Sequence, residues 1–262
     1  MAEQIFSLTG VSFSYPGGIA ALSGISLAIN KGERTAIIGA NGTGKSTLLA
    51  MLDALIFPQK GLCTFSGKEI SGHSMDDAAF QKKFRKKVGF VFQNPEIQLF
   101  CPTVKEDILF GPLQLGIPKD EMLKRFDRTV NLLKLTTLLE RPPHALSIGE
   151  KKKVAIASVL VIEPEVLLLD EPTAGLDPQT VRDIIGVLQH AHEAGKTIVF
   201  ATHDLHIVEE IADVIHVFGA GRNIIRSGPP EEILSDKGFL QHHNLAHIHV
   251  HRHAHSGHVH EH

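Results

Sequence analysis

Hydrophobic and polar positions follow two different patterns along the chain, and these patterns predict two kinds of strand. Short alternating segments, IFSLTG, VSFSY and GISLAI, occupy the first 29 or so residues and are broken by Pro16, Gly17 and Gly18. This alternation is typical of antiparallel strands joined by turns. Nearly continuous apolar runs come later, as expected for strands covered on both faces in a parallel sheet. These runs are TAII at 35–38, VLLL at 166–169, TIVFA at 197–201 and DVIHVF at 213–218.

Segments with helical spacing separate these runs. KDEMLKRFDRTVNLLKL carries an apolar face, and the helix expected after Pro178 carries another and should stop at Gly195. Four prolines between positions 95 and 118 break the preceding stretch into short helical pieces. The patterns predict an α/β fold with an N-terminal antiparallel β-subdomain. One domain is expected over residues 1–240, with a helical subdomain of about 94–161 inserted in its core.

A glycine-rich segment links one buried strand to a helix. Residues 39–46 read GANGTGKS, directly after TAII and directly before the helical run TLLAMLDALIF. Strand, glycine-rich loop and helix in this order form a phosphate-binding (P-loop) site, because backbone N–H groups, a helix start and a lysine surround the phosphates while a hydroxyl binds Mg²⁺. The alternative is a chance match in a glycine-rich turn. The predicted nucleotide-binding residues are Gly39, Asn41, Gly42, Gly44, Lys45, Ser46 and Thr47.

Two acids end the second apolar run. Asp170 falls at the carboxyl edge of a predicted parallel strand, where it can hold Mg²⁺ beside the phosphate loop, together with Ser46. Glu171 follows on an extended segment, so its side chain points elsewhere and can face an attacking water. We therefore predict that Glu171 is the general base. The alternative is a pair of solvated acids at a strand end.

Composition limits the class of protein. The chain has 262 residues and 43% hydrophobic content, which suffices for a full core. Two cysteines, Cys63 and Cys101, and an N-terminus without a charged and apolar leader predict a reduced, cytoplasmic protein. The apolar stretches are far shorter than the roughly twenty residues of a membrane-spanning helix. Net charge is -3, and the basic run at 82–87 contains a single aromatic residue, so no nucleic-acid partner is expected.

The segment Leu146, Ser147, Ile148, Gly149, Glu150 resembles the L-S-G-G-Q signature of the nucleotide-binding subunit of ABC transporters. Ser147 is a good N-cap, and the N–H groups of the next three residues would point from the helix start toward a γ-phosphate. The resemblance implies that this phosphate belongs to ATP held by a second protomer, in a homodimer or pseudo-homodimer. Ile148 and Glu150 depart from the signature. Ile148 excludes positive φ, and Glu150 adds a negative charge.

The resemblance assigns further positions. Gln93, after an apolar run, matches the Q-loop glutamine that meets the metal and the water, and His203 matches the switch histidine. Asp177, in AGLD, matches the D-loop at the dimer interface, and Ser147 and Gly149 are implied to bind nucleotide. Tyr15, the one tyrosine, occupies the place where the family stacks an aromatic ring on adenine. The alternative for Tyr15 is an edge-strand residue that packs on the core.

The segment after Gln93 is rich in apolar residues: Ile97, Leu99, Phe100, Ile108 and Phe110. The resemblance implies that this surface accepts a coupling helix from an integral membrane transport subunit. The alternative is that these residues pack inside the helical subdomain. The amino-acid sequence here and around Ser147 resembles that of the cobalt and nickel importers of the energy-coupling-factor branch.

The C-terminal tail, residues 241–262, is rich in histidine: ten of the seventeen histidines lie from position 242 onward. Neutral imidazole binds Ni²⁺, Co²⁺, Cu²⁺ and Zn²⁺, so the tail is predicted to be flexible and to capture transition metal such as Ni²⁺ or Co²⁺. A purification tag, a meaningless low-complexity end and a flexible arm are the alternatives. The candidate ligands at every second position are His247, His249, His251, His253 and His255.

Together these features predict an ATPase that powers a cobalt or nickel importer and lies as a peripheral protein on the cytoplasmic face of the cell membrane. Three alternatives remain open. They are an ATPase of a vitamin importer of the same branch, a soluble ABC ATPase of DNA repair or the ribosome, and a metal-storage or delivery protein whose cassette regulates the tail.

Overall fold

A six-stranded sheet forms the centre of the molecule. The computed structural model describes residues 3–245, 248–253 and 256–261. Strand order in the sheet is β10-β9-β3-β8-β7-β6, and all neighbours are parallel except β10 and β9. The strands are β3 (Arg34–Gly39), β6 (Val88–Val91), β7 (Val166–Asp170), β8 (Thr197–Thr202), β9 (Val214–Phe218) and β10 (Ile224–Gly228).

The run VLLL shows why this sheet needs cover on both faces. Leu167 and Leu169 pack into the hydrophobic cluster on one face, whereas Val166 and Leu168 pack into the cluster on the other. All four are 1% exposed or less. A strand without polar positions is therefore buried on both sides, which confirms the interpretation of the apolar runs as parallel strands.

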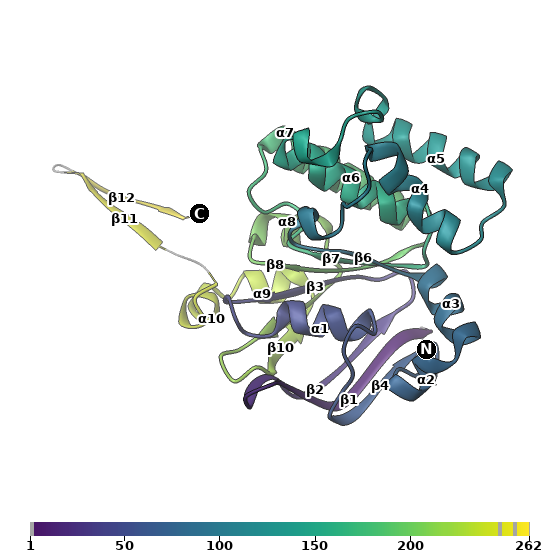
Figure 1. The fold of residues 1–262 in the computed structure, drawn as a ribbon. Helices are drawn as coiled ribbons and strands as arrows, with labels where there is room; N and C mark the ends of the chain where they lie inside the picture. The colour runs from purple at the N-terminus through teal and green to yellow at the C-terminus, as the bar shows by residue number, and fades with distance from the viewer. Residues whose placement is uncertain (1–2, 246–247, 254–255, 262) are drawn as a thin grey trace.

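A second sheet of four antiparallel strands, in the order β2-β1-β4-β5, lies below the first in Figure 1. It contains the alternating N-terminal segments, as predicted. It also contains two strands from residues 60–69, which lie outside the alternating N-terminal segments on which the prediction rests. The strands are β1 (Gln4–Tyr15), β2 (Ile19–Asn30), β4 (Lys60–Phe65) and β5 (Lys68–Glu69).

Helices alone join β6 to β7 in the described chain, and α4, α5 and α6 gather above the central sheet in Figure 1. Capping residues mark where they begin: Thr103 and Ser147 each start a helix with a capping box. The elements of this segment are η1 (Pro95–Ile97), α4 (Val104–Gln114), α5 (Lys119–Leu133), η2 (Thr136–Leu138), η3 (Pro143–Ala145) and α6 (Ile148–Leu160).

The other helices cover the two faces of the central sheet or follow its edge. Helix α7 has the apolar face predicted after Pro178, with Ile184, Ile185 and Leu188 buried. Helix α1 packs on the opposite face, against β7 and β8. The bounds are α1 (Lys45–Leu52), α2 (Gly72–Asp76), α3 (Ala78–Lys87), α7 (Pro178–Glu193), α8 (Leu205–Ile211), α9 (Pro230–Leu234) and α10 (Lys237–His242).

The tail contains an antiparallel pair of strands, β11 (Ile248–His253) and β12 (Ser256–Glu261). Three β-branched residues, Ile248, Val250 and Val259, favour the extended backbone there. In the register, His249 lies opposite His260 and His251 opposite His258. Flexibility of the tail stays a prediction. No helix in the described part of the chain is long and apolar enough to cross a membrane.

Candidate nucleotide-binding site

The phosphate loop turns sharply between β3 and α1, and only glycine fits its turns. Gly42 and Gly44 have φ of 78° and 107°. A Cβ on Gly44 would lie 2.3 Å from the carbonyl oxygen of Ala21. A side chain at either position would strain the backbone, so these two glycines are fixed by geometry as well as by the ligand they are predicted to bind.

The lysine of the loop is almost fully buried. Lys45 is 6% exposed, and its ammonium donates hydrogen bonds to the carbonyl oxygens of Gly39 and Ala40, at 2.7 and 3.2 Å. Burial lowers the pKa of Lys45, whereas the nearby carboxylates of Glu171 and Asp170 oppose that shift. The ammonium is therefore held by neutral carbonyls inside the loop that is predicted to surround the phosphates.

Asp170 has the properties of a cation ligand. It ends β7, is 5% exposed, and its Oδ1 has no hydrogen-bond partner among the described residues. Burial is the main cause that raises the pKa of Asp170, and a hydrogen bond from Ser46 opposes it. A buried carboxylate oxygen without a partner, beside a serine hydroxyl, fits a hard cation such as Mg²⁺. Asp170 and Ser46 thus lie together, as the predicted Mg²⁺ site requires.

Glu171 does not lie on the extended segment that the sequence predicts. Its backbone is not extended: φ is 44°, in the left-handed region that a glutamate rarely adopts. Its carboxylate accepts a hydrogen bond from Thr202 Oγ1 at 3.2 Å, and His203 Nδ1 lies 2.9 Å from Oε1. The structure therefore pairs the predicted base directly with the predicted switch histidine, across β7 and β8.

Lys152 is a further buried residue beside Gln93 and Glu171, and the sequence analysis did not identify it. It lies on α6, is 2% exposed, and donates to the main-chain oxygens of Phe92, Gln93 and Glu171 at 3.1, 2.7 and 3.4 Å. Burial lowers the pKa of Lys152 to about 8. In the sequence it belongs to a run of three lysines that looks like a solvated helix face, so no local pattern distinguishes it.

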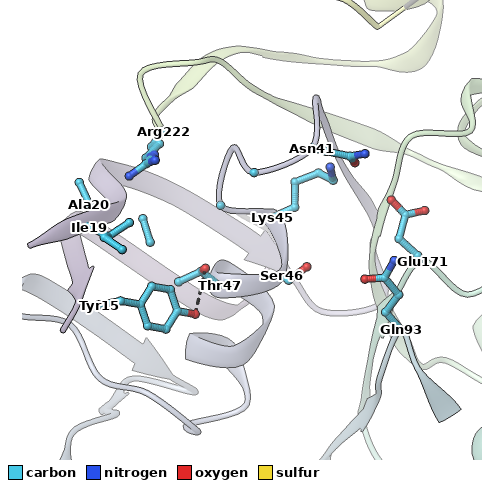
Figure 2. Close-up of a pocket in the computed structure, with 13 residues that line it drawn as sticks. Tyr15, Ile19, Ala20, Asn41, Lys45, Ser46, Thr47, Gln93, Glu171 and Arg222 are labelled. Atoms are coloured by element: carbon cyan, nitrogen blue, oxygen red, sulfur yellow. Dashed lines mark hydrogen bonds between the residues drawn. The ribbon is translucent and has the colours of Figure 1, made fainter. Parts of the chain in front are cut away.

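These elements border one cavity of about 410 Å³. Figure 2 shows Tyr15 at one end of it and Gln93 and Glu171 at the other, with Lys45 and Ser46 between them. Tyr15 is 42% exposed, and its hydroxyl lies 3.3 Å from Thr47 Oγ1. The predicted residues that line the cavity are Tyr15, Asn41, Gly42, Gly44, Lys45, Ser46, Thr47, Gln93 and Glu171, and the lining residues that were not predicted are Ile19, Ala20, Ala21 and Arg222.

The signature segment begins α6 as expected, but its first turn differs in one detail. The Ser147 hydroxyl accepts from the Glu150 N–H at 3.3 Å, and the Glu150 carboxylate accepts from the Ser147 N–H at 2.7 Å. The prediction that the Glu150 N–H is free for a phosphate is therefore wrong, because the capping box uses it. Ile148 is the first helical residue and does not need positive φ, so the isoleucine is tolerated there.

The signature and the D-loop meet each other away from the cavity. A Cβ on Gly149 would lie 3.2 Å from Thr180 Oγ1, and Thr180 Oγ1 donates to Asp177 Oδ2 at 2.6 Å. Asp177 also caps α7. Ser147, Gly149 and Asp177 are absent from the cavity lining. One protomer thus carries two separate groups of predicted site residues.

The sequence profile of the ABC transporter family matches residues 22–174, more than half of the chain. This chain belongs to the ABC transporter family. The ABC ATPase is similar to the nickel import ATP-binding protein NikO of Rhodobacter capsulatus, with 48% identity over 92% of this chain and 95% of NikO. The energy-coupling factor transporter ATP-binding protein EcfA of Methanothermobacter thermautotrophicus is 42% identical over 92% of this chain and 76% of EcfA.

Solved structures of ABC ATPases confirm the fold. CbiO1 of Clostridium perfringens, part of the ABC transporter complex CbiONQ, has a TM-score of 0.78 at 40% identity and covers 93% of this chain and 95% of its own. The cassette MJ0796, solved as a post-hydrolysis dimer with ADP and Pi, has a TM-score of 0.77 at 29% identity, over 86% and 98% of the two chains.

The apolar residues after Gln93 divide into two groups in this ABC ATPase. Leu99 and Ile108 are buried, at 8% and 0% exposure, so for them the packing alternative is correct. Ile97, Phe100 and Phe110 are 65%, 64% and 40% exposed, and the unpredicted Leu113 is 59% exposed. We call these four exposed residues the α4 patch. The rings of Phe100 and Phe110 lie edge to face at 4.9 Å.

The tail histidines are placed only in part. His249, His251 and His253 fall at alternate backbone positions of β11, whereas His247 and His255 lie outside the described residues.

Proposed function

We propose that this ABC ATPase is the ATP-hydrolysing subunit of an importer for nickel or cobalt ions, bound to the cytoplasmic face of the cell membrane through integral membrane subunits. The observation that carries the proposal is the 48% identity to a nickel import ATP-binding protein along nearly the whole of both chains. The likeness to CbiO1, part of the CbiONQ complex, supports the same assignment.

The site geometry supports a division of roles among its residues. Tyr15 holds the base, and the loop residues from Gly39 to Thr47 hold the phosphates, with Lys45 as the cation. Asp170, Ser46 and Gln93 would hold Mg²⁺, which when bound neutralises charge on the phosphates. Glu171 takes the general-base role because its carboxylate reaches the cavity and is oriented by His203 and Thr202.

A second protomer supplies the rest of the site. Ser147, Gly149 and Asp177 lie together on one surface of the chain, outside its own cavity. The N–H groups of Ile148 and Gly149 at the start of α6 are suited to an anion approaching from a facing molecule. Two copies arranged head to tail would therefore place each signature on the other's ATP, in line with the dimeric cassette MJ0796.

The α4 patch is the surface proposed to receive a membrane subunit. Four large apolar side chains exposed on η1, α4 and the turn between them are more than an isolated soluble surface needs. Gln93 lies a few residues before this patch on the same segment, so movement of the docked subunit and movement of the Q-loop are linked through the backbone.

The histidine-rich tail is proposed to bind Ni²⁺ or Co²⁺. Histidines at alternate backbone positions of β11, with His249 opposite His260 in the register, place several candidate ligands in one short hairpin. The tail then acts as an accessory that captures ions and is not part of the ATP site.

Uptake measured in vesicles tests the proposal. The chain would be co-expressed with candidate integral membrane transport subunits, and uptake of ⁶³Ni²⁺ and ⁵⁷Co²⁺ followed with and without ATP. We expect ATP-dependent uptake that Glu171→Gln abolishes and that a chain ending at residue 245 retains at saturating metal, with weaker capture at low metal. Uptake of a vitamin in place of either ion would contradict the proposal and favour the vitamin-importer alternative.

A further inference from the structure

Arg222 lies at the nucleotide cavity although it is far from the phosphate loop in sequence. It belongs to the turn between β9 and β10, beyond the region that the family profile matches, residues 22–174. The cavity is nevertheless lined by Arg222, and Figure 2 shows its side chain across from Tyr15, near Ile19 and Ala20. This is the end of the cavity away from Gln93 and Glu171.

The position of Arg222 follows from the register of the central sheet. β9 is parallel to β3, with Phe218 opposite Gly39, so both chains leave the sheet at the same edge. Gly39 then enters the phosphate loop and Phe218 enters the β9–β10 turn. The turn is closed by hydrogen bonds from the Arg222 N–H to Gly219 and from the Gly219 N–H to Asn223, at 2.9 and 3.0 Å.

A second contact fixes the turn to the antiparallel sheet. The Ser23 N–H donates to the Arg222 carbonyl oxygen at 2.9 Å, and Ser23 follows the lining residues Ala20 and Ala21 on β2. Arg222 itself has φ of 60°, a strained conformation for a residue with a side chain. Two sheets thus hold one arginine at the cavity, at a cost in backbone strain.

The guanidinium of Arg222 has no partner within the described chain. Among the described residues it makes no hydrogen bond and no ion pair, although the residue is half-buried. Other half-buried arginines of the chain are paired: Arg34 with Asp213, Arg85 with Asp53 and Arg226 with Glu232 and Asp236. A half-buried guanidinium gains free energy from a ligand that offers acceptor atoms or an aromatic face.

We propose that Arg222 binds the base and ribose end of ATP, opposite Tyr15. The guanidinium donates to acceptor atoms of the base or sugar or lies over the base face, while Tyr15 offers its ring from the other side. The inference rests on ATP binding by this family and not on the identity of the transported ion. It assigns a role in nucleotide affinity, and not in the cleavage of the phosphate bond.

Binding of ATP and of inorganic tripolyphosphate to the purified chain tests the proposal, because tripolyphosphate has no base or sugar. Both ligands would compete with a fluorescent ATP analogue in the presence of Mg²⁺. Arg222→Ala should weaken ATP binding roughly three- to tenfold and leave tripolyphosphate binding unchanged. In steady-state hydrolysis the same variant should raise KM and leave kcat within about twofold.

Arg226→Ala is the matched control. Arg226 lies on β10 of the same hairpin, but its guanidinium binds Glu232 and Asp236. It should leave both affinities unchanged, and Arg222→Lys should retain part of the ATP affinity. Equal affinity of wild type and Arg222→Ala for ATP would overturn the proposal, and so would an equal loss for ATP and tripolyphosphate. Thermal unfolding without nucleotide checks that each variant is folded.

Discussion

Lys152 connects three parts of the candidate site through one side chain. Its buried ammonium donates to carbonyls of the Q-loop and of Glu171, and it lies on the helix that begins with the signature residue Ser147. No carboxylate lies in hydrogen-bond contact with it in the described chain, so burial dominates and lowers the pKa of Lys152 to about 8. Its charge therefore changes within an accessible pH range.

The pKa of Lys152 predicts how stability varies with pH. Its ordinary pKa is 10.5, so between pH 8 and 10.5 the unfolded chain keeps a proton that the folded chain has released. The free energy of unfolding should then rise with pH in that range, relative to Lys152→Gln, by about 3 kcal/mol. Urea unfolding of both proteins at pH 7.5 and 10 measures the difference.

A neighbouring lysine provides the control for that measurement. Lys151 precedes Lys152 on α6 and pairs with Glu96, so Lys151→Gln should show the same pH trend as wild type. If wild type and Lys152→Gln keep a constant difference in unfolding free energy across the range, the assignment of the titration to Lys152 is wrong.

The residues that could be predicted are those whose function follows from a local pattern. Lys45 follows from the glycine loop before a helix, and Asp170 from a buried strand that ends in an acid. Lys152 and Arg222 could not be predicted in this way. Their positions depend on which helix packs on the Q-loop and on the register of β9 against β3, and neither is encoded in neighbouring residues.

At the scale of elements, the segment from η1 to α4 combines two roles. Its buried residues Leu99 and Ile108 fix the segment in the core, which frees the α4 patch to face outward. Asp107 holds the turn before α4, since its Oδ1 accepts from the N–H groups of Phe100 and Cys101 at 3.1 and 3.0 Å. The family resemblance implies a docking surface in this apolar segment, but which side chains face outward depends on how the segment packs on the core.

Phe100→Asp should separate docking from catalysis. Phe100 is 64% exposed, so an aspartate is accommodated without loss of core packing, but a charged side chain would be buried at a docked interface. We expect ATP hydrolysis by the isolated chain to change less than twofold and affinity for the membrane subunits to fall at least about thirtyfold. Co-purification with those subunits measures the loss.

Leu132→Asp is the corresponding control, because Leu132 lies on α5 outside the α4 patch and is 40% exposed. It should co-purify with the membrane subunits as wild type does. Normal docking of Phe100→Asp would show that the partner binds another surface.

At the scale of the molecule, the predicted site residues of each chain fall into two separate groups, which the proposed dimer would bring together. The cavity is lined by Lys45, Ser46 and Glu171 at the end predicted to hold the phosphates, whereas Ser147 and Asp177 lie outside it. The overall α/β architecture with its two sheets could be predicted from the strand patterns. The membership of β4 and β5 in the antiparallel sheet could not be predicted, because KGLCTF has no feature that selects one sheet over the other.

Hydrolysis should therefore depend on the concentration of the protein. Wild-type ATPase activity per chain is expected to rise steeply as dilute protein is concentrated and then level off.

Glu171→Gln should lower turnover more than about a hundredfold and accumulate as an ATP-bound dimer, since binding is kept and the base is lost. Light scattering with ATP·Mg²⁺ measures the mass, and Lys45→Ala serves as a control that should stay monomeric. Activity per chain that is independent of concentration would contradict the shared site.

The walls of the cavity come from distant parts of the sequence: β1 and β2, the phosphate loop with the start of α1, the residues that follow β6 and β7, and the turn after β9. A single small molecule bound there would contact all of these regions at once, in addition to the hydrogen bond from Ser23 to Arg222 that already joins two of them. The nucleotide would therefore add contacts between these regions when it binds, and each cycle of hydrolysis and release would remove and restore those contacts.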